Sequence, residues 1–270
     1  MQNSGKKTIK TREIVSQFKE RGRRPEITPR RAKILGVFSC KGGVGKTTTV
    51  SNVGSVLSEK IDGGVLVVDA NLSAPNLGLH LGIIDVETSM HDVLTGAAPV
   101  EKAIHVVGEK LHAIPGSLAY EGDTPLVDFK TVLEPLRKNY KLIIVDSAPG
   151  LGTETIAAIK ACDDMLIVTN PEIPTIASTL RTFRAAERYR VPVMGVVLNK
   201  VRGKKYEVPI SEVKNNLGWP LLMTVPDDEK VRESLTAGVP VVRHAPKSSA
   251  ARAFLELADR VFDKLKSGKS

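Results

Sequence analysis

The chain has 270 residues, 41% hydrophobic and only 4% aromatic, which is enough aliphatic side chain to fill the core of one α/β domain. No apolar run approaches the roughly 20 residues of a membrane-spanning helix, and the N-terminus lacks the apolar stretch of a secretory signal. The two cysteines, Cys40 and Cys162, form no C-x-x-C pair and suggest no metal site. From these features we expect neither an integral membrane protein nor a metal site built on cysteine.

The net charge of +9 is concentrated at the N-terminus. Residues 1–33 hold 11 lysines and arginines against three glutamates, so this segment carries +8 of the total. We predict a basic N-terminal extension over residues 1–32. Four apolar residues share one face of a possible helix there, Ile9, Ile14, Val15 and Phe18. Such a segment suits an anionic membrane, nucleic acid or an acidic partner, and it is equally compatible with a solvated tail.

A glycine-rich stretch follows the first apolar run, residues 34–38, and leads into a helical pattern that reaches residue 57. A strand, a glycine turn and a helix are the context of a phosphate-binding loop, because the turn and the helix N-terminus direct backbone N–H groups toward one point. Lys46 is placed to reach the β- and γ-phosphates of a nucleotide, and the Thr47 hydroxyl to bind Mg²⁺. The predicted binding residues are Lys41, Gly42, Gly43, Val44, Gly45, Lys46, Thr47 and Thr48.

The loop departs from the pattern G-x-x-x-x-G-K-[ST], because position 40 is cysteine, and Lys41 heads the loop instead. The form K-G-G-x-G-K-T-T resembles the MinD/ParA family of P-loop ATPases with a deviant Walker A motif, and MinD-like proteins in particular. The resemblance implies Mg²⁺ and ATP as cofactors. It also implies that Lys41 reaches the nucleotide of a partner subunit, and therefore a homodimer in the ATP state.

Residues 65–68 predict a buried parallel strand that ends at Asp69. The following segment, residues 69–79, resembles the first switch segment of the family, usually D-x-D followed by N-L. Asp69 matches the first acid, whereas Asn71 replaces the second acid, which in the family orients or deprotonates the attacking water. An amide cannot accept that proton. We therefore assign Lys41, Lys46, Asp69 and Asn71 to catalysis and predict slow hydrolysis.

A second strong strand, residues 142–145, closes on Asp146. Asp146 matches the Walker B aspartate of the family, which holds Mg²⁺ through a water, so the resemblance makes Thr47 and Asp146 the metal residues. Residues 146–150 resemble the second switch segment, where Gly150 or its neighbours could contact the γ-phosphate. Residues 111–116 predict an edge strand and turn. The pattern over residues 126–138 predicts a helix that Pro135 ends or kinks.

Further strands are predicted over residues 165–169, 193–198 and 221–225, with helices between them. By resemblance, Asn199 after one strand and Pro226 after the last lie beside adenine, and residues 170–172 line a dimer interface. The helix over residues 250–265 has an apolar face that favours packing on the sheet over membrane binding. We thus divide the chain into the extension, an ATPase domain of residues 33–265 and a tail of residues 266–270.

Strands alternate with helices, so the expected fold is α/β, a mostly parallel doubly wound sheet with helices on both faces. The resemblance makes it a P-loop NTPase of the SIMIBI type. It implies a MinD-like, Mg-ATP-dependent dimerising switch ATPase for spatial positioning, of the cell division site or of organelles or machinery. Its partner would be a regulatory or cargo protein. We expect a cytoplasmic protein, or one peripheral on the inner face of the membrane.

Other interpretations stay open at this point. A ParA-like partition ATPase would bind DNA nonspecifically through the basic N-terminal segment. A scaffold could bind ATP with little hydrolysis, and Asn71 is compatible with that. A metallocluster carrier of the Mrp kind, or a relative of nitrogenase reductase, is disfavoured because Cys162 has no nearby partner cysteine in the sequence.

Overall fold

The structure is a computed structural model that describes residues 31–120, 122 and 128–267. The chain divides into two units, Met1–Arg31 and Ala32–Ser270, and only the second is described below. The prediction of an amphipathic basic segment falls on residues 1–30, outside the described residues.

The second unit is built on one eight-stranded sheet in the order β3-β4-β2-β5-β1-β6-β7-β8. Every neighbouring pair is parallel except β3 with β4, which confirms the mostly parallel α/β sheet. The strands are β1 (Lys33–Phe38), β2 (Val65–Ala70), β3 (His105–Val106), β4 (Leu111–Ile114), β5 (Leu142–Ser147), β6 (Asp164–Thr169), β7 (Val193–Val201) and β8 (Leu221–Pro226).

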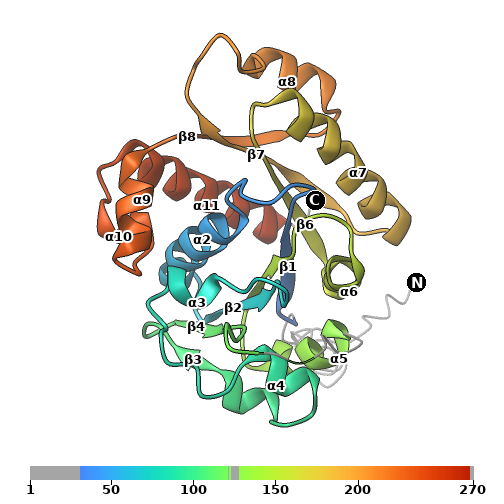
Figure 1. Ribbon diagram of the computed structural model, residues 1–270, viewed down its shortest axis with the longest axis vertical. Helices are drawn as coiled ribbons and strands as arrows, with labels where there is room; N and C mark the ends of the chain where they lie inside the picture. Colours follow the sequence, from blue (N-terminus) through green and yellow to red (C-terminus); the bar gives the residue numbers. More distant parts are fainter. Residues whose placement is uncertain (1–30, 121, 123–127, 268–270) are drawn as a thin grey trace, which may run out of the picture. The chain divides into compact units, whose positions relative to one another are not determined.

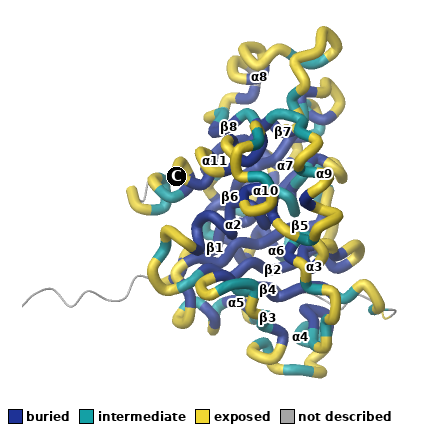
Figure 2. The backbone as a smooth tube through the Cα atoms, turned by 90° about the vertical axis from the view of Figure 1, so that its left-hand side faces the viewer, coloured by how far each residue is buried: buried dark blue, intermediate teal, exposed yellow. Residues whose placement is uncertain are grey.

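The central strands are buried along their whole length because both faces of the sheet are covered. All six residues of β2, β5 and β6 are buried, as their unbroken apolar runs predict for parallel strands. Figure 2 shows these strands as a continuous buried layer with the exposed positions outside it. Alternate residues of β1 point to opposite faces: Leu35 and Val37 belong to one apolar cluster, Ile34 and Phe38 to the other.

Helices cover both faces (Figure 1). The helix after the glycine loop, α2, packs with α11 over one face, and α5, α6 and α7 cover the other. The α-helices are α2 (Lys46–Lys60), α3 (Leu77–His80), α4 (Met90–Leu94), α5 (Phe129–Leu133), α6 (Thr153–Ala161), α7 (Ile173–Tyr189), α8 (Ile210–Asn216), α9 (Glu229–Thr236), α10 (Val241–His244) and α11 (Ser249–Ser267); the 3₁₀ helices are η1 (Val100–Ala103) and η2 (Glu134–Lys138).

Two expectations about strands need correction. The strand predicted over residues 111–116 is β4, and it is not at the edge, because the two-residue β3 pairs with it antiparallel. The pattern missed β3 because two residues are too short to show a period. Strand β7 continues beyond residue 198 to Val201, past an irregularity where Lys200 adopts a positive φ of 58°. The effect of Pro135 is confirmed: the α-helical turn ends at Leu133 and a 3₁₀ helix follows.

The last helix, α11, is part of the core. Ala250, Phe254, Leu257 and Val261 are fully buried on one side of it, against α2 and β8. This supports the packed interpretation of its apolar face, and the helix runs to Ser267, two residues beyond the predicted end. No helix among the described residues combines the length and apolar character needed to cross a bilayer.

Candidate functional site

The glycine loop lies at the carboxyl end of β1 and is shaped by two positive φ angles, 75° at Gly43 and 99° at Gly45. Gly45 is the N-cap of α2, so Lys46 is its first helical residue. The first N–H groups of a helix have no intrahelical acceptor, and together with the helix dipole they attract anions. The loop therefore offers the geometry of a phosphate cradle, as the sequence predicts.

Two residues at the end of β7 form hydrogen bonds with backbone carbonyls of the glycine loop. The Asn199 side-chain amide donates to the Val44 carbonyl at 2.7 Å, and the Lys200 ammonium donates to the Gly43 carbonyl at 2.6 Å. A Cβ atom at Gly45 would lie 2.1 Å from the Asn199 nitrogen, so glycine is required here on steric grounds as well as by its φ. Asn199, predicted near adenine, therefore lies directly beneath the loop.

Three charged side chains meet behind the loop. Burial lowers the pKa of Lys46, while the charges of Asp146 and Asp69 raise it. Burial raises the pKa of Asp69, and the neighbouring Asp146 raises it further. The two aspartates occupy adjacent strands in register, β2 and β5, which is why Asp69 and Asp146 are neighbours. The structure thus brings together the lysine and both predicted carboxylates.

The surroundings of Asp146 show whether the residues present suit a metal ion. It is 1% exposed, and neither carboxylate oxygen has a hydrogen-bond partner. Burial raises its pKa, whereas the Lys46 charge and the nearby Thr47 hydroxyl lower it. Buried polar atoms normally find partners, and carboxylate and hydroxyl oxygens beside a phosphate loop are what Mg²⁺ and its waters prefer. The residues present therefore fit a magnesium ion.

Asp69 and Asn71 differ in what their side chains contact. Asp69 accepts three backbone N–H bonds of 3.0 Å, from Asn71, Asn76 and Leu77, so both its oxygens organise the first switch segment (residues 69–79). The Asn71 amide nitrogen donates to the Ala74 carbonyl, but its Oδ1 is buried without a partner. Of the two, Asn71 is the one with a free acceptor.

A hollow of about 450 Å³ opens in front of the loop. Among its lining residues are loop residues from Gly42 to Thr48 together with Asn71, Asn199 and Pro226, so predicted residues from four separate stretches share one cavity. His80 of α3 also lines it, and burial lowers the pKa of that imidazole to about 4. The cavity is large enough and suitably lined for a nucleotide.

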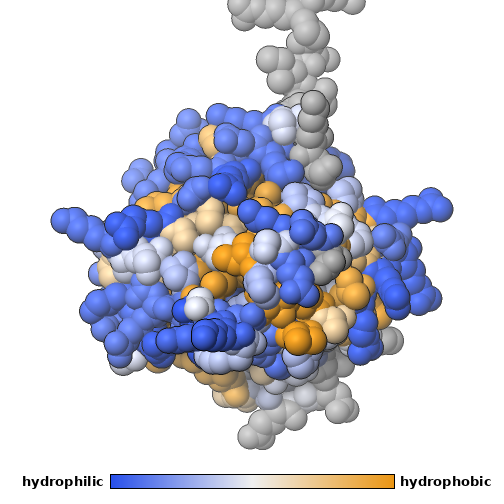
Figure 3. Space-filling model, turned by 90° about the horizontal axis from the view of Figure 1, so that it is seen from above, coloured by the Kyte–Doolittle hydropathy of each residue, from blue (hydrophilic) through white to orange (hydrophobic). Residues whose placement is uncertain are grey.

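Lys41 faces a different, adjoining hollow. Its ammonium lies 3.2 Å from Glu172 Oε2 and 3.5 Å from Thr175 Oγ1, both at the start of α7. Both charged side chains are about half exposed, 53% and 52%. The exposed Tyr206 helps line this hollow, and the exposed Ile173 follows Glu172 in the chain. Figure 3 shows apolar surface among hydrophilic side chains on the face seen from above.

The second switch segment, residues 146–150, is joined to the start of the loop. Gly150 has a φ of 82°, and its N–H donates to the Ser39 carbonyl at 3.1 Å. The predicted contact of Gly150 with a γ-phosphate would require this bond to open. The segment leads through Gly152, the N-cap of α6, into a helix whose first turn carries Glu154.

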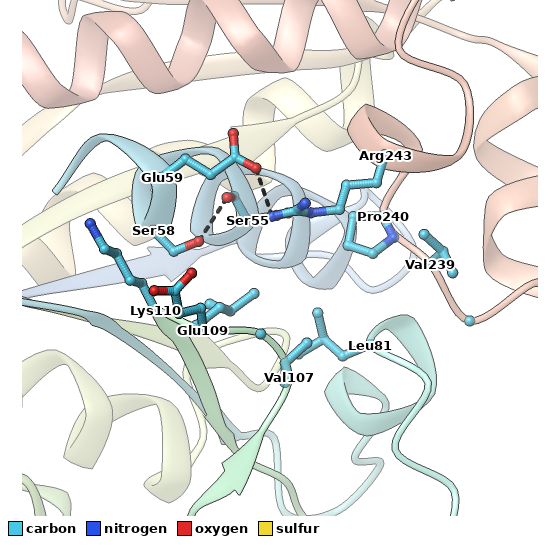
Figure 4. Close-up of a pocket in the computed structure, with 13 residues that line it drawn as sticks. Ser55, Ser58, Glu59, Leu81, Val107, Glu109, Lys110, Val239, Pro240 and Arg243 are labelled. Carbon is cyan, nitrogen blue, oxygen red and sulfur yellow. Dashed lines mark hydrogen bonds and ion pairs between the residues drawn. The ribbon is translucent and has the colours of Figure 1, made fainter.

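A second cavity, of about 530 Å³, lies between α2, the β3–β4 turn and α10 (Figure 4). Arg243 projects across it and pairs with Glu59, and its Nε donates to Ser55 Oγ at 2.8 Å. None of the predicted site residues lines this cavity. Its arginine is paired with Glu59 and its lysine, Lys110, with Asp62 outside the cavity, so neither cation is left for a phosphate.

Sequence reasoning missed several residues that shape the site. His80 lines the nucleotide-sized cavity only because α3 packs beside α2. Lys200 and Glu154 act on backbone groups far away in the chain, and no local pattern reports such contacts. A positive φ outside glycine, as at Lys200, has no reliable sequence signal.

A loop of this geometry at the carboxyl edge of a parallel sheet defines the chain as a P-loop NTPase. A model of the ParA family, described as NUBPL iron-transfer P-loop NTPase, matches residues 30–262, and the chain therefore belongs to the ParA family. The resemblance to MinD/ParA proteins in the sequence is confirmed.

Known relatives span nearly the same length. An uncharacterized ATP-binding protein of Methanocaldococcus jannaschii is 31% identical over 84% of this chain and 86% of its own. The sporulation initiation inhibitor Soj of Bacillus subtilis is 31% identical over 85% of this chain and 98% of its own. The MinD protein of Pyrococcus horikoshii, solved with Mg-ADP, superposes with a TM-score of 0.82 at 32% identity, covering 88% and 99% of the two chains.

The matched family is described by iron transfer, which makes the environment of the two cysteines relevant. In this chain Cys162 is buried, its thiol donates to the Ala158 carbonyl at 3.1 Å, and burial raises its pKa. Cys40 is partly exposed. Within residues 31–120, 122 and 128–267, no group of three or more metal-ligating side chains is present.

Proposed function

We propose that the protein is a MinD-like, Mg-ATP-dependent dimerising switch ATPase that hydrolyses ATP slowly and acts in spatial positioning. The observation that carries the proposal is the buried Asp146 carboxylate, which has no hydrogen-bond partner and lies beside Lys46 and Thr47 at the phosphate loop. Membership in a family of ATPases and the Mg-ADP in a 32% identical MinD structure support the same nucleotide and metal here.

Different residues of the site would bind the phosphates, the metal ion and the adenine. The amides from Gly42 to Thr48, with the Lys46 ammonium, hold the phosphates. Thr47 and Asp146 would hold Mg²⁺, which would neutralise phosphate charge when bound. Asn199 and Pro226 border the adenine, in the cavity that they share with the loop. Because Asn199 also holds the Val44 carbonyl, base recognition and loop shape are coupled in one side chain.

Slow turnover follows from the groups around the attacking water. Asn71 Oδ1 is a buried acceptor without a partner on the edge of the cavity, suited to hold a water by hydrogen bonding. It cannot take the proton of that water. Asp69 contributes by fixing the backbone that carries Asn71, through its three N–H bonds. Positioning without a base is consistent with a slow switch.

Dimerisation depends on Lys41. The side chain stands at the rim of the site, half exposed, with Glu172 as its partner. An exposed pair of this kind is worth about 0–1 kcal/mol, so Lys41 can leave Glu172 at little cost and reach the phosphates of a second subunit. The exposed Ile173 and Tyr206 would be covered when the two faces meet.

Spatial positioning requires a surface and a cargo. We propose a regulatory or cargo protein as partner, and attachment of the basic N-terminal segment (residues 1–32) to an anionic membrane. The protein would then be cytoplasmic, or peripheral on the inner face of the membrane. Co-sedimentation with anionic vesicles and with DNA, in ATP and in ADP, tests this for the full chain and a chain lacking residues 1–30. Retention on neither surface favours a protein partner.

The decisive experiment measures nucleotide binding and mass together. Wild type should bind MgATP and become a dimer in analytical ultracentrifugation, and remain a monomer with ADP. Lys46→Ala should lose nucleotide binding, whereas Lys41→Ala should bind nucleotide and stay monomeric. Lys160→Ala, a surface lysine of α6, is the control. Normal nucleotide uptake by Lys46→Ala, or a monomeric wild type in saturating MgATP, would refute the proposal. Tight binding with turnover near zero would favour an ATP-dependent scaffold.

Nonspecific DNA binding in the manner of a partition ATPase is the second candidate, and α7 gives it a specific observation. Arg181, Arg184 and Arg188 all lie on the exposed side of this helix, where their charges remain available for phosphates. If DNA is the surface, retention should need ATP and fall steeply with salt, and replacing these three arginines should flatten that salt dependence.

A further inference from the structure

The peptide that follows Asn71 is held from both sides by groups outside its own segment. The Leu72 N–H donates to Glu154 Oε2 at 3.1 Å, and the Ser73 hydroxyl donates to Glu154 Oε1 at 2.5 Å. Glu154 therefore uses both carboxylate oxygens on two consecutive residues. Hydrogen bonds to a charged acceptor are the stronger kind, so this is a defined anchor of the first switch segment.

The other side of the same residue is held by His91 of α4. This ring is 1% exposed; its Nε2 lies 3.1 Å from the Leu72 carbonyl, and its Nδ1 lies 3.1 Å from the Ser117 backbone nitrogen. Since the Ser117 N–H can only donate, Nδ1 accepts and the ring proton is on Nε2, which donates to Leu72. The ring stacks on Tyr120 with centroids 4.4 Å apart. The His91 ring is thus held in place by both of its nitrogens and by the stacking on Tyr120.

Glu154 and His91 belong to elements that differ in their connection to the phosphate loop. His91 belongs to α4, away from the loop, whereas Glu154 lies in the first turn of α6, directly after the second switch segment. That segment is joined to the phosphate loop by the bond from the Gly150 N–H to the Ser39 carbonyl. A continuous path of hydrogen bonds and short backbone therefore runs from Ser39 through Gly150 and Glu154 to Leu72.

We propose that Glu154 is a positioning residue that couples the two switch segments. It transmits the arrangement of residues 146–150 to the Leu72 peptide and so sets the direction of the Asn71 side chain. Asn71 is fixed on its other side by the bond of its own N–H to Asp69. A shift of α6 relative to the stationary His91 would pull on Leu72 and move Asn71 Oδ1. The inference rests on the proposed nucleotide switch and deepens it.

The first test needs no nucleotide. In Glu154→Ala the Leu72 amide loses a charged acceptor, so its hydrogen exchange should accelerate about tenfold to a hundredfold. Glu154→Gln keeps one carbonyl oxygen for Leu72 and can accept or donate at Ser73, so it should stay near wild type. Glu256→Ala, which removes an exposed pair with Arg260 on α11, is the matched control. Unchanged exchange in Glu154→Ala would overturn the inference.

The second test measures coupling. In wild type, MgATP should slow exchange in residues 71–73 and in residues 146–152 together. In Glu154→Ala only residues 146–152 should respond, nucleotide affinity should stay within about twofold, and kcat should fall about tenfold with KM unchanged. A Glu154→Ala chain in which both segments still respond refutes the coupling and leaves the ATPase proposal intact. A wild type that binds no nucleotide refutes the ATPase proposal itself.

Discussion

The side-chain amide of Asn199 donates a 2.7 Å hydrogen bond to the carbonyl of Val44, which lies 155 residues earlier in the chain. The contact passes directly under Gly45, where a Cβ atom would lie 2.1 Å from the Asn199 nitrogen. The end of β7 therefore shapes the phosphate loop, and Gly45 must be glycine for two independent reasons, its φ of 99° and this close approach.

Gly45→Ala should consequently lose nucleotide binding and stability together. A left-handed alanine costs about 1 kcal/mol, and the collision with Asn199 adds to it. Asn199→Ala should cost less, about 1–2 kcal/mol, because it removes one hydrogen bond and leaves a carbonyl unpaired. Urea unfolding measures both. In the double variant the collision is absent, so the two effects should be less than additive; full additivity would contradict the geometry.

Asp146→Asn should make the protein more stable and less able to use magnesium. Burial raises the pKa of this carboxyl, so its ionised form destabilises the fold at neutral pH, and an amide should gain about 1–3 kcal/mol. The gain should shrink as the pH falls and Asp146 takes up its proton. Unfolding by urea without nucleotide, and the stabilisation by MgATP, measure the two effects.

Asp69→Asn is the matched control, because both oxygens of Asp69 accept backbone N–H bonds. Burial and Asp146 raise the pKa of Asp69 too, so its charge is also costly. An amide there, however, turns one acceptor into a donor that faces backbone donors, and this loss should dominate and destabilise the variant by about 1–3 kcal/mol. Opposite signs for the two aspartates support the assignment of Asp146 to the metal. Equal loss of stability in both would contradict it.

Asn71→Asp should raise kcat and lower stability. A carboxylate can accept the proton of the attacking water, which an amide cannot. It would also lose the bond that Asn71 donates to the Ala74 carbonyl and sit 8% exposed in a site that already holds Asp69 and Asp146. Steady-state phosphate release measures the rate and thermal unfolding the stability. An unchanged kcat, with a wild type that is already fast, would show that Asn71 does not limit hydrolysis.

His80 should make the fold sensitive to mild acid. Its pKa falls from 6.5 to about 4 on burial, so between these values the unfolded chain binds a proton that the folded chain does not. Stability is therefore unaffected above pH 6.5 and declines as the pH drops toward 4, by up to about 3 kcal/mol from this group. Thermal unfolding of wild type and His80→Gln from pH 7 to 4 measures it. Identical pH profiles would exclude His80 as the cause.

The comparison of sequence and structure is clearest at the phosphate loop. The lysine-bearing glycine stretch and the unbroken apolar runs ending at Asp69 and Asp146 predicted the loop, the parallel sheet and a carboxylate at the end of each of two strands. Local order suffices for these, because the strand period and the glycine turn each depend on a few adjacent residues. The sequence could not show that both carboxylate oxygens of Asp69 accept hydrogen bonds from backbone N–H groups of the first switch segment.

By itself, then, the sequence determined the class of protein, the position of the loop and the deviant Lys41, since each depends on a contiguous pattern. Only the tertiary structure decided that Lys41 pairs with Glu172, that Asn199 supports the loop, and that Glu154 and His91 hold Leu72 from opposite sides. Those contacts join residues 19 to 155 positions apart. Whether these contacts form depends on how the helices pack over the sheet. The same packing determines which buried oxygens are left without a hydrogen-bond partner.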